Sequence, residues 1–348
     1  MAKSFERHLA VPSHVSLSVP RTRVEAEEVQ AQLRARLDSW VGRFGPMPPR
    51  GRVNLRVDSE RKWSWFDGYL EQHVTYEGEP NERIPAYLLI PNKGSPPFPA
   101  VVAHHQCYVD CDVGKEAVVG KAYLRPDQAF GFELVNRGYV VLAPDSINCG
   151  ERNVNGVREQ GVRDKTKCWS AVMNHLSVGS FYLKHLYDST RAVDLLESLS
   201  FVDHDRIGMI GHSLGAGTTF WTMAYDTRVK AGVVSCHFLG GLSDGGWGHF
   251  YKAPRSGIYY HEMLGMMPPR ALLATRGERE TPLGPEDLQS TEEERSVLRW
   301  AFDYGRLFCR LYGVSEERVQ VRVFEGGHEF PKDEREHAYH WLDTVLAS

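Results

Sequence analysis

Short apolar runs alternate with amphipathic stretches along most of this chain, from about residue 69 onward. Several runs are almost continuously apolar, namely AVVAH, YVVLA, RIGMI, AGVVS and ALLAT. Strands of a parallel sheet have this composition when helices cover both faces of the sheet. The runs predict eight strands: Tyr69–Tyr76, Pro85–Ile90, Ala100–His104, Tyr139–Ala143, Arg206–Ile210, Ala231–Cys236, Ala271–Thr275 and Val319–Phe324.

Helical patterns fill the gaps between several of these strands, with apolar residues at three- and four-residue steps. They cover residues 126–137, 178–199, 214–225, 292–312 and 333–346. This alternation predicts an α/β fold on an open, mostly parallel sheet with right-handed crossovers. The polar loop YEGEPNER between the first two strands indicates an antiparallel pair at one edge of the sheet.

The first 60 residues lie outside this alternation and predict a helical extension to a main domain that covers residues 61–348. Within the extension, residues 22–44 form an amphipathic pattern that includes Leu33, Leu37 and Trp40, and GPMPPRG ends it. An amphipathic helix needs an apolar partner, which is either the main domain or another subunit.

Two segments of the main domain, about residues 144–177 and 237–269, are longer than an ordinary connection and are predicted to be insertions after the fourth and sixth strands. Connections of this length are usually functional or lid-like. The aromatic side chains of the second insertion either line an apolar pocket or anchor the loop to the domain. They are Trp247, Phe250, Tyr251, Tyr259 and Tyr260.

Composition excludes several classes of protein. Lys and Arg number 41 and Asp and Glu 45, a net charge of −4, which argues against a nucleic-acid-binding surface. No apolar stretch reaches the ~18 residues of a membrane span. The N-terminus lacks the apolar core of a secretory signal, although a chain already processed would look the same. Six cysteines without a CxxC pair favour free thiols in a cytoplasmic protein.

The run RIGMI leads into Gly211-His-Ser-Leu-Gly215, a GxSxG pattern, and then into a helical stretch. A strand that turns sharply into a helix at a serine exposes its hydroxyl at the helix N-terminus, where the helix dipole favours developing negative charge. The pattern alone is weak, because Gly and Ser cluster in turns that carry no chemistry. Its position between strand and helix favours Ser213 as a nucleophile.

A serine nucleophile needs a base, and the base needs an acid that orients it. In a strand–elbow–helix fold the acid and then the histidine follow on loops after late strands. His328 follows the last strand in EGGHEF and is the predicted base. Glu280 is preferred as the acid because it lies deep in the loop after ALLATR. Glu278 in the same loop is the second choice, and Asp244 is a further candidate.

Two backbone N–H groups are needed to stabilise the oxyanion that forms during attack on a carbonyl. Leu214 follows the nucleophile and is expected to supply one of them. The other is expected from the loop after the third strand, either from Gln106 or from Cys107.

The adjacent histidines His104 and His105 raise the question of a metal. Neighbouring side chains in an extended segment point in opposite directions, and the chain has no HxH or HExxH pattern, so no metal site is expected there. We instead expect His105 to shape the substrate pocket. The residues predicted to line this pocket are His105, His212, Trp247 and Tyr251.

Together these segments resemble the α/β-hydrolase superfamily, and within it the dienelactone hydrolase and acetyl xylan esterase-like group. The resemblance covers roughly residues 69–346 and rests on AYLLIPNKGSPPFPAVVAHHQC, FELVNRGYVVLAPDSINCGER, IGMIGHSLGAGTT, PPRALLATRGERETPL and EGGHEF. It implies the α/β-hydrolase fold, a catalytic triad of Ser213, Glu280 and His328, and neither a metal nor an organic cofactor.

The chain departs from the family pattern at two places. The acid is usually Asp, and Glu280 stands at the matching position. The usual His-Gly after the third strand reads His105-Gln106, so the oxyanion loop is expected to differ in shape. Asp145 and the turn Gly150-Glu-Arg152 match a familiar block, for which a structural role is favoured over catalysis.

The leading hypothesis is a serine hydrolase that cleaves a carboxylic ester of a small molecule through an acyl-enzyme. The same triad also suits lactone, amide or peptide, and carbon–carbon bonds. A third hypothesis is a non-catalytic binding protein on a hydrolase fold, because fold does not imply function. No nucleic-acid or membrane partner is expected, and a homo-oligomer whose second subunit completes the pocket stays open.

Overall fold

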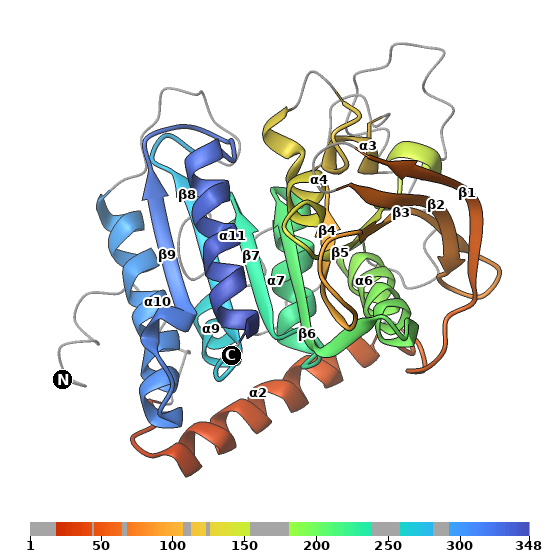
Figure 1. The fold of residues 1–348 in the computed structure, drawn as a ribbon. Coiled ribbons are helices and arrows are strands. Elements are labelled where there is room, and N and C mark those ends of the chain that lie inside the picture. Colours follow the sequence, from red (N-terminus) through yellow and green to blue (C-terminus); the bar gives the residue numbers. More distant parts are fainter. Residues whose placement is uncertain are drawn as a thin grey trace.

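The computed structural model describes residues 19–43, 45–64, 68–106, 113–122, 126–153, 181–237, 258–280 and 292–347. Within these residues a single twisted sheet of nine strands runs through the molecule, in the order β1-β2-β3-β5-β4-β6-β7-β8-β9 (Figure 1). The strands are β1 Leu55–Trp63, β2 Tyr69–Glu77, β3 Arg83–Pro91, β4 Phe98–His104, β5 Val140–Pro144, β6 Val202–His212, β7 Ala231–Ser235, β8 Ala271–Gly277 and β9 Val319–Phe324.

The predicted mostly parallel sheet with an antiparallel edge is confirmed. Strand β4 pairs in parallel with β5 and β6, and β6 through β9 continue in parallel. Strands β1, β2, β3 and β5 pair antiparallel. The eight strands predicted from the apolar runs correspond to β2 through β9. The carboxyl ends of the parallel strands therefore meet at one edge, where α/β folds carry their sites.

Strand β1 is the ninth strand, which the hydrophobic pattern missed. Its seven central residues are exposed, so the segment LRVDSERKW shows no apolar alternation to indicate a strand. It is held by pairing with β2, where Leu55 lies opposite Tyr76. The sheet thus begins at residue 55, and the predicted domain boundary at residue 60 is wrong because it cuts this strand.

Helices cover both faces of the sheet, as the continuous apolar strands predicted. One face packs against α6, α7, α9 and α10 around a core that includes Phe220 and Phe302, and the other packs against α4 and α11 around Phe130 and Leu342. None of the helices in the described ranges is long and apolar enough to cross a membrane. The helices are α2 Arg23–Gly42, α3 Lys115–Val118, η1 Pro126–Gln128, α4 Phe130–Val135, η2 Gly150–Arg152, α6 Phe181–Ser198, α7 Leu214–Tyr225, α9 Tyr260–Gly265, α10 Glu292–Tyr312, η4 Glu316–Arg318 and α11 Lys332–Ala347.

The N-terminal helix α2 packs on the main domain of its own chain. It crosses below α7, α9 and α10 (Figure 1). Trp40 of α2 stacks on Trp221 of α7 with ring centroids 5.4 Å apart. The buried side chain of Gln30 donates hydrogen bonds of 2.8 Å to the carbonyls of Gly265 and Pro268. The apolar partner that the sequence required is therefore the sheet-bearing domain itself.

The start of the first insertion is tied to the sheet through Asp145, which follows β5. The buried carboxylate of Asp145 accepts from the backbone N–H of Lys115 at 2.8 Å and that of Glu151 at 3.0 Å, and it pairs with Lys115 Nζ at 2.5 Å. The guanidinium of Arg152 donates to Asp145 O at 3.0 Å and pairs with Asp188 of α6 at 2.7 Å. These contacts support the structural role expected for Asp145 and the Gly150-Glu-Arg152 turn.

Candidate active site

Ser213 stands at the sharp turn between β6 and α7, as the GxSxG pattern predicted. Its backbone has φ 55° and ψ −113°, a conformation that non-glycine residues rarely adopt and that costs about 1–3 kcal/mol. The Ser213 N–H donates to Ser235 O at 2.8 Å, and Ser213 O accepts from Gly217 N at 3.1 Å. Backbone contacts to a neighbouring strand and to the helix thus stabilise the strained residue and leave its side chain partly exposed.

The two glycines of the pattern are required by close backbone packing. A methyl group on Gly211 would lie 2.2 Å from Gly215 O, and one on Gly215 would lie 2.2 Å from His104 O. Only glycine permits these approaches. They bring the end of β4 directly against the first turn of α7.

The two predicted oxyanion donors come from the first turn of α7 and from the segment after β4. Leu214 is the first residue of α7, where backbone N–H groups have no partner within the helix. Gln106, which is buried, belongs to the segment after β4 that packs on this turn. The segment expected to supply the second donor therefore lies beside the first. The alternative donor, Cys107, lies outside the described residues.

His328 and Glu280 are joined by a hydrogen bond of 3.0 Å between Nδ1 and Oε1. The side chain of His328 is 44% exposed, whereas that of Glu280 is fully buried. Two backbone hydrogen bonds of 2.9 Å hold their loops together, from Glu278 N to Phe324 O and from Arg279 N to Gly326 O. The structure thus brings together the base and the preferred acid of the sequence prediction.

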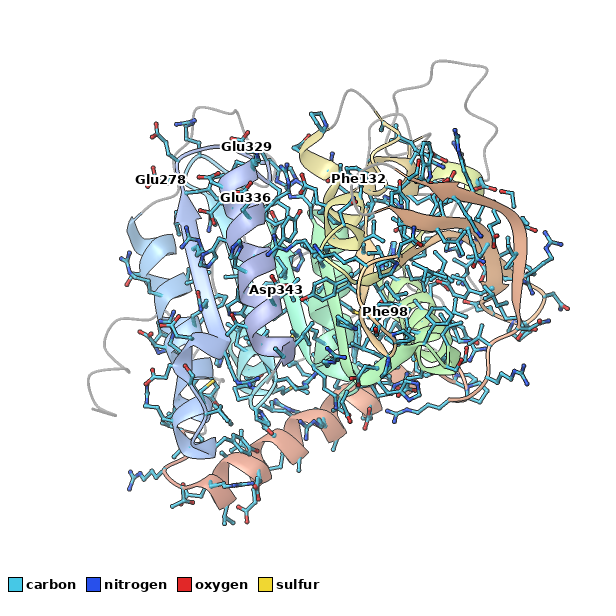
Figure 2. All side chains as sticks on the ribbon, viewed as in Figure 1. Phe98, Phe132, Glu278, Glu329, Glu336 and Asp343 are labelled. Carbon is cyan, nitrogen blue, oxygen red and sulfur yellow. The ribbon has the colours of Figure 1, made fainter. Side chains whose placement is uncertain are left out.

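Glu278, the second choice for the acid, is exposed where β8 ends (Figure 2). In the part of the chain that the structure describes, no hydrogen bond is made by its carboxylate. The geometry selects Glu280 of the two glutamates in this loop. Asp244, the further candidate, lies outside the described residues.

His212 lies beneath His328 and does not line a pocket, so this sequence prediction is wrong. Its side chain is fully buried, and as the residue before Ser213 in an extended strand it points to the side opposite to that of the serine. Its ring lies 4.9 Å from the ring of His328 and stacks on Phe330 at 6.4 Å. Its Nδ1 lies 3.0 Å from Ser235 Oγ. His212 supports the ring of His328 from within the core.

His105 is also fully buried, in the segment directly after β4. The hydrogen-bond network assigns the proton to Nδ1, which donates to Gln106 O at 2.7 Å, while Nε2 accepts from Ser146 N at 2.9 Å. Burial lowers the pKa of His105, and it lowers that of His104 to about 3, so both rings are neutral. Nε2 of His104 lies 2.9 Å from Oγ of Ser189, so the two neighbouring rings have separate partners.

The elbow at Ser213 is linked to His328 through the preceding residue, His212, whose ring lies 4.9 Å from the ring of His328. Within the described residues, no hydrogen bond joins Ser213 Oγ to the imidazole. Catalytic hydrogen bonds are often long in a free enzyme and shorten when substrate binds. Ser213, Glu280 and His328 therefore follow three parallel strands at one edge of the sheet, and the contact between His328 and Glu280 is formed in the free protein.

Cys236 is a site residue that the sequence analysis did not single out as such. It follows β7 at φ 58°, is 1% exposed, and its thiol donates to Glu329 O at 3.2 Å. Burial, and then the charge of Glu280, raise the pKa of the thiol well above its ordinary value, so Cys236 is neutral. Its place at the carboxyl end of a central parallel strand was the available signal. Donor atoms of His212, Cys236 and His328 lie within 4.8 Å of one another.

The aromatic residues of the second insertion are only partly described. Trp247 and Tyr251, predicted to line the pocket, lie outside the described residues. Tyr260 is buried, and its hydroxyl lies 3.2 Å from Nε2 of His237. For this residue the structure favours the anchoring alternative over a place in a pocket.

Sequence comparisons match this chain to a known family. A family model described as acetyl xylan esterase (AXE1) matches residues 67–243. The "Putative hydrolase YtaP" of Bacillus subtilis (strain 168) is 31% identical over 279 residues, which cover 78% of this chain and 88% of that protein. The residues that the family model matches include the elbow at Ser213.

Solved structures share the fold at low sequence identity. A glucuronoyl esterase from Solibacter usitatus has a TM-score of 0.65 at 14% identity and covers 92% of both chains. A CE15 glucuronoyl esterase from Teredinibacter turnerae T7901 has a TM-score of 0.62 at 16% identity, over 93% of this chain and 86% of that chain. The shared architecture is the α/β-hydrolase fold that the sequence predicted.

Proposed function

Since this chain belongs to the acetyl xylan esterase (AXE1) family, we propose that it removes a small acyl group from a carbohydrate ester, with Ser213 as the nucleophile. Membership makes the chain a serine hydrolase that acts on carboxylic esters. One observation carries the assignment of residues: the exposed imidazole of His328 is bonded to the buried Glu280 beside the elbow that presents Ser213.

In the first half-reaction, Nε2 of His328 takes the proton of Ser213 as its Oγ attacks the ester carbonyl carbon. The carbonyl oxygen becomes an oxyanion, which the backbone N–H of Leu214 and that of Gln106 or Cys107 stabilise. When the intermediate collapses, the carbon–oxygen bond to the alcohol breaks. His328 gives the proton to the departing oxygen, and the acyl group remains on Ser213.

In the second half-reaction, a water molecule replaces the alcohol. His328 takes a proton from the water, whose oxygen attacks the acyl carbon, and collapse of the second intermediate returns that proton to Ser213 and releases the carboxylic acid. Glu280 holds Nδ1–H throughout and stabilises the imidazolium in each step. Because Glu280 is fully buried, its charge acts in a low local dielectric, where it stabilises a cation more strongly than in water.

We infer the small acyl group and the carbohydrate from the family to which the chain belongs. Three other kinds of bond are alternatives to the ester. A lactone, as in dienelactone hydrolases, an amide or a carbon–carbon bond would use the same triad. A non-catalytic binding role is disfavoured, because binding alone gives no reason to keep a strained Ser213 beside a paired acid and base.

Cys236 and Cys309 are free thiols. Free thiols support a further part of this proposal, that the enzyme works in the cytoplasm, where thiols stay reduced. Fractionation of cells that express the full chain would test it, and recovery of the enzyme outside the cell would contradict it.

The proposed function is tested with wild type and Ser213→Ala on p-nitrophenyl acetate and acetylated xylo-oligosaccharides. We expect the variant to lose hydrolysis by at least about a thousandfold while its circular dichroism spectrum stays unchanged. A fluorophosphonate probe should label the wild type at Ser213 and leave the variant unlabelled. A Ser213→Ala variant with wild-type activity would refute the triad, and a folded wild type that resists the probe would favour the binding role. Activity on lactones or aminoacyl amides above that on acetyl esters would reassign the bond.

A further inference from the structure

The loop after β9 has to carry His328 across the ends of two strands toward the elbow. Ser213 follows β6, and the sheet order β6-β7-β8-β9 places β7 and β8 between that strand and β9. Because neighbouring strands lie about 4.8 Å apart, the end of β9 is roughly 14 Å from the end of β6. The contacts that the loop makes on the way decide where the imidazole of His328 stands.

The two outer contacts of this loop lie at the ends of β8 and β6. Beside β8, the backbone N–H of Arg279 donates to Gly326 O at 2.9 Å. At the end of β6, the ring of His212 lies 4.9 Å from the ring of His328. These contacts hold the start of the loop and the imidazole, and the peptide groups on either side of His328 lie between them.

Cys236 makes the middle contact, directly after β7. Its thiol donates to Glu329 O at 3.2 Å and lies 4.0 Å from Gly327 O. These carbonyls belong to the two residues that flank His328 in the chain. The sulfur also lies within 4.8 Å of a ring nitrogen of His328. The thiol therefore contacts the loop on both sides of the base.

The backbone around Cys236 is fixed by both neighbouring strands. Its N–H donates to Thr275 O of β8 at 2.8 Å, and the preceding carbonyl, of Ser235, accepts from Ser213 N at 2.8 Å. Cys236 has φ 58°, which a residue other than glycine keeps only where its surroundings hold it there. Its side chain thus starts from a point tied to the strands of both the nucleophile and the acid.

The chemistry of a thiol suits this position. Burial, and then the charge of Glu280, raise the pKa of the Cys236 thiol well above its ordinary value, so it keeps the proton that it donates. A neutral side chain also adds no second negative charge beside the carboxylate of Glu280. Cys236 is 1% exposed, so its contacts with the loop are made without competing water.

We propose that Cys236 is a positioning residue for the catalytic base: its thiol holds the peptide groups around His328 and so places the imidazole between Glu280 and Ser213. Without the thiol the loop keeps its contacts at the ends of β8 and β6 and loses the one in the middle. A catalytic group misplaced by about 1 Å can lower a rate about a hundredfold. The effect on rate rests on the proposed function, whereas the placement of the ring does not.

The kinetic test compares Cys236→Ala with Cys309→Ala in the full chain, on p-nitrophenyl acetate. Cys309 is also buried but lies in α10, so each variant removes one buried sulfur atom and both should melt at lower temperature than the wild type. Only Cys236→Ala should lower kcat, by about tenfold to a hundredfold, with KM within about twofold. Cys236→Ser keeps a donor for Glu329 O, so its kcat should lie within about threefold of wild type.

Cys236→Gly covers the case in which the alanine variant fails to fold. Glycine adopts φ 58° without strain, and it lacks the thiol as alanine does. We expect it to be as slow as Cys236→Ala while it melts at a higher temperature. A rate that followed melting temperature instead would indicate a purely structural role and would overturn the proposal.

NMR of histidine labelled with ¹³C follows the ring without relying on hydrolysis. The Cε1–H resonance of His328, identified by its loss in His328→Gln, is sensitive to placement because the ring of His212 lies 4.9 Å away. It should move in Cys236→Ala, and it should stay near its wild-type position in Cys236→Ser and Cys309→Ala. A wild type without esterase activity would refute the proposed function and leave this measurement valid.

Three results would contradict the role of Cys236. They are a kcat loss in Cys236→Ala no larger than that in Cys309→Ala, a Cys236→Ser variant as slow as Cys236→Ala, and a His328 resonance that stays in place when the thiol is removed.

Discussion

Nδ1 of His328 lies 3.0 Å from Oε1 of Glu280, and this bond joins an exposed ring to a carboxylate that has no exposed surface. The two residues are 48 positions apart in the chain and follow neighbouring parallel strands, β8 and β9. Their relative position is set by backbone hydrogen bonds between the two loops rather than by the side chains alone. The contact between the two side chains is thus formed in the free protein.

Replacing each glutamate of the loop after β8 in turn tests which of the two is the catalytic acid. Glu280→Gln keeps the size of the side chain but removes the charge that stabilises the imidazolium, so we expect kcat to fall by about a hundredfold to ten-thousandfold. Glu278→Gln is the control from the same loop and should stay within about twofold of wild type, because Glu278 is exposed. Initial rates on p-nitrophenyl acetate measure both. Equal losses in the two variants would show that the acid is misassigned.

The contact between the two loops predicts a steric effect at Gly277. A methyl group there would lie 2.2 Å from Gly327 O, a backbone atom, so Gly277→Ala must push the His328 loop away from Glu280. We expect a loss of about 1–3 kcal/mol in the free energy of unfolding and about a hundredfold in kcat.

Gly327→Ala is the partner control, because a methyl group on Gly327 meets nothing within 4 Å. Thermal unfolding and rates on the same ester compare the two variants. If Gly277→Ala behaves like Gly327→Ala, the loops do not depend on this close approach.

Buried neutral histidines predict that the protein loses stability in mild acid. Burial lowers the pKa of His104 and His261 to about 3 and that of His237 to about 4, against an ordinary value of 6.5. Below about pH 6.5 the unfolded chain takes up protons that the folded chain does not, so the free energy of unfolding falls as the pH drops toward about 4. Urea unfolding at several pH values measures the slope, and a flat profile would contradict the prediction.

His261→Phe tests one of these residues. The ring of His261 packs 4.8 Å from Trp300, and neither of its nitrogens has a hydrogen-bond partner in the described part of the chain. Phenylalanine keeps the ring and removes the unsatisfied polar atoms, so we expect about 1 kcal/mol of added stability at neutral pH. The pH slope should fall by up to about 1.4 kcal/mol per pH unit. His204→Phe, at an exposed position, should leave the slope unchanged.

The N-terminal helix is predicted to be part of the folded domain. Trp40 is 4% exposed and stacks on Trp221, so Trp40→Ala should lower the free energy of unfolding by about 3–5 kcal/mol. Val24→Ala, in the same helix but 62% exposed, should change it by no more than about 0.5 kcal/mol. Chemical denaturation compares the two variants. A small loss for Trp40→Ala would mean that α2 is a detachable extension.

Several features follow from the sequence because they depend on local order. The nearly continuous apolar runs determine the central strands β4 through β8, since strands covered on both faces need apolar side chains at nearly every position. The GxSxG pattern between a predicted strand and a predicted helix locates the sharp turn at Ser213. The position of His328 in EGGHEF, directly after the last predicted strand, places it on a loop at the edge of the sheet. Each of these predictions depends only on residues that are close neighbours in the sequence.

Other features were decided only by the tertiary structure. The choice of Glu280 over Glu278 depends on hydrogen bonds between loops that are far apart in the chain. Strand β1 exists through pairing with β2, because its own exposed side chains give it no apolar pattern. His105 and His212 proved to be core residues, and Cys236 joined the site, because burial and proximity depend on which side chains the packed sheet and helices bring together.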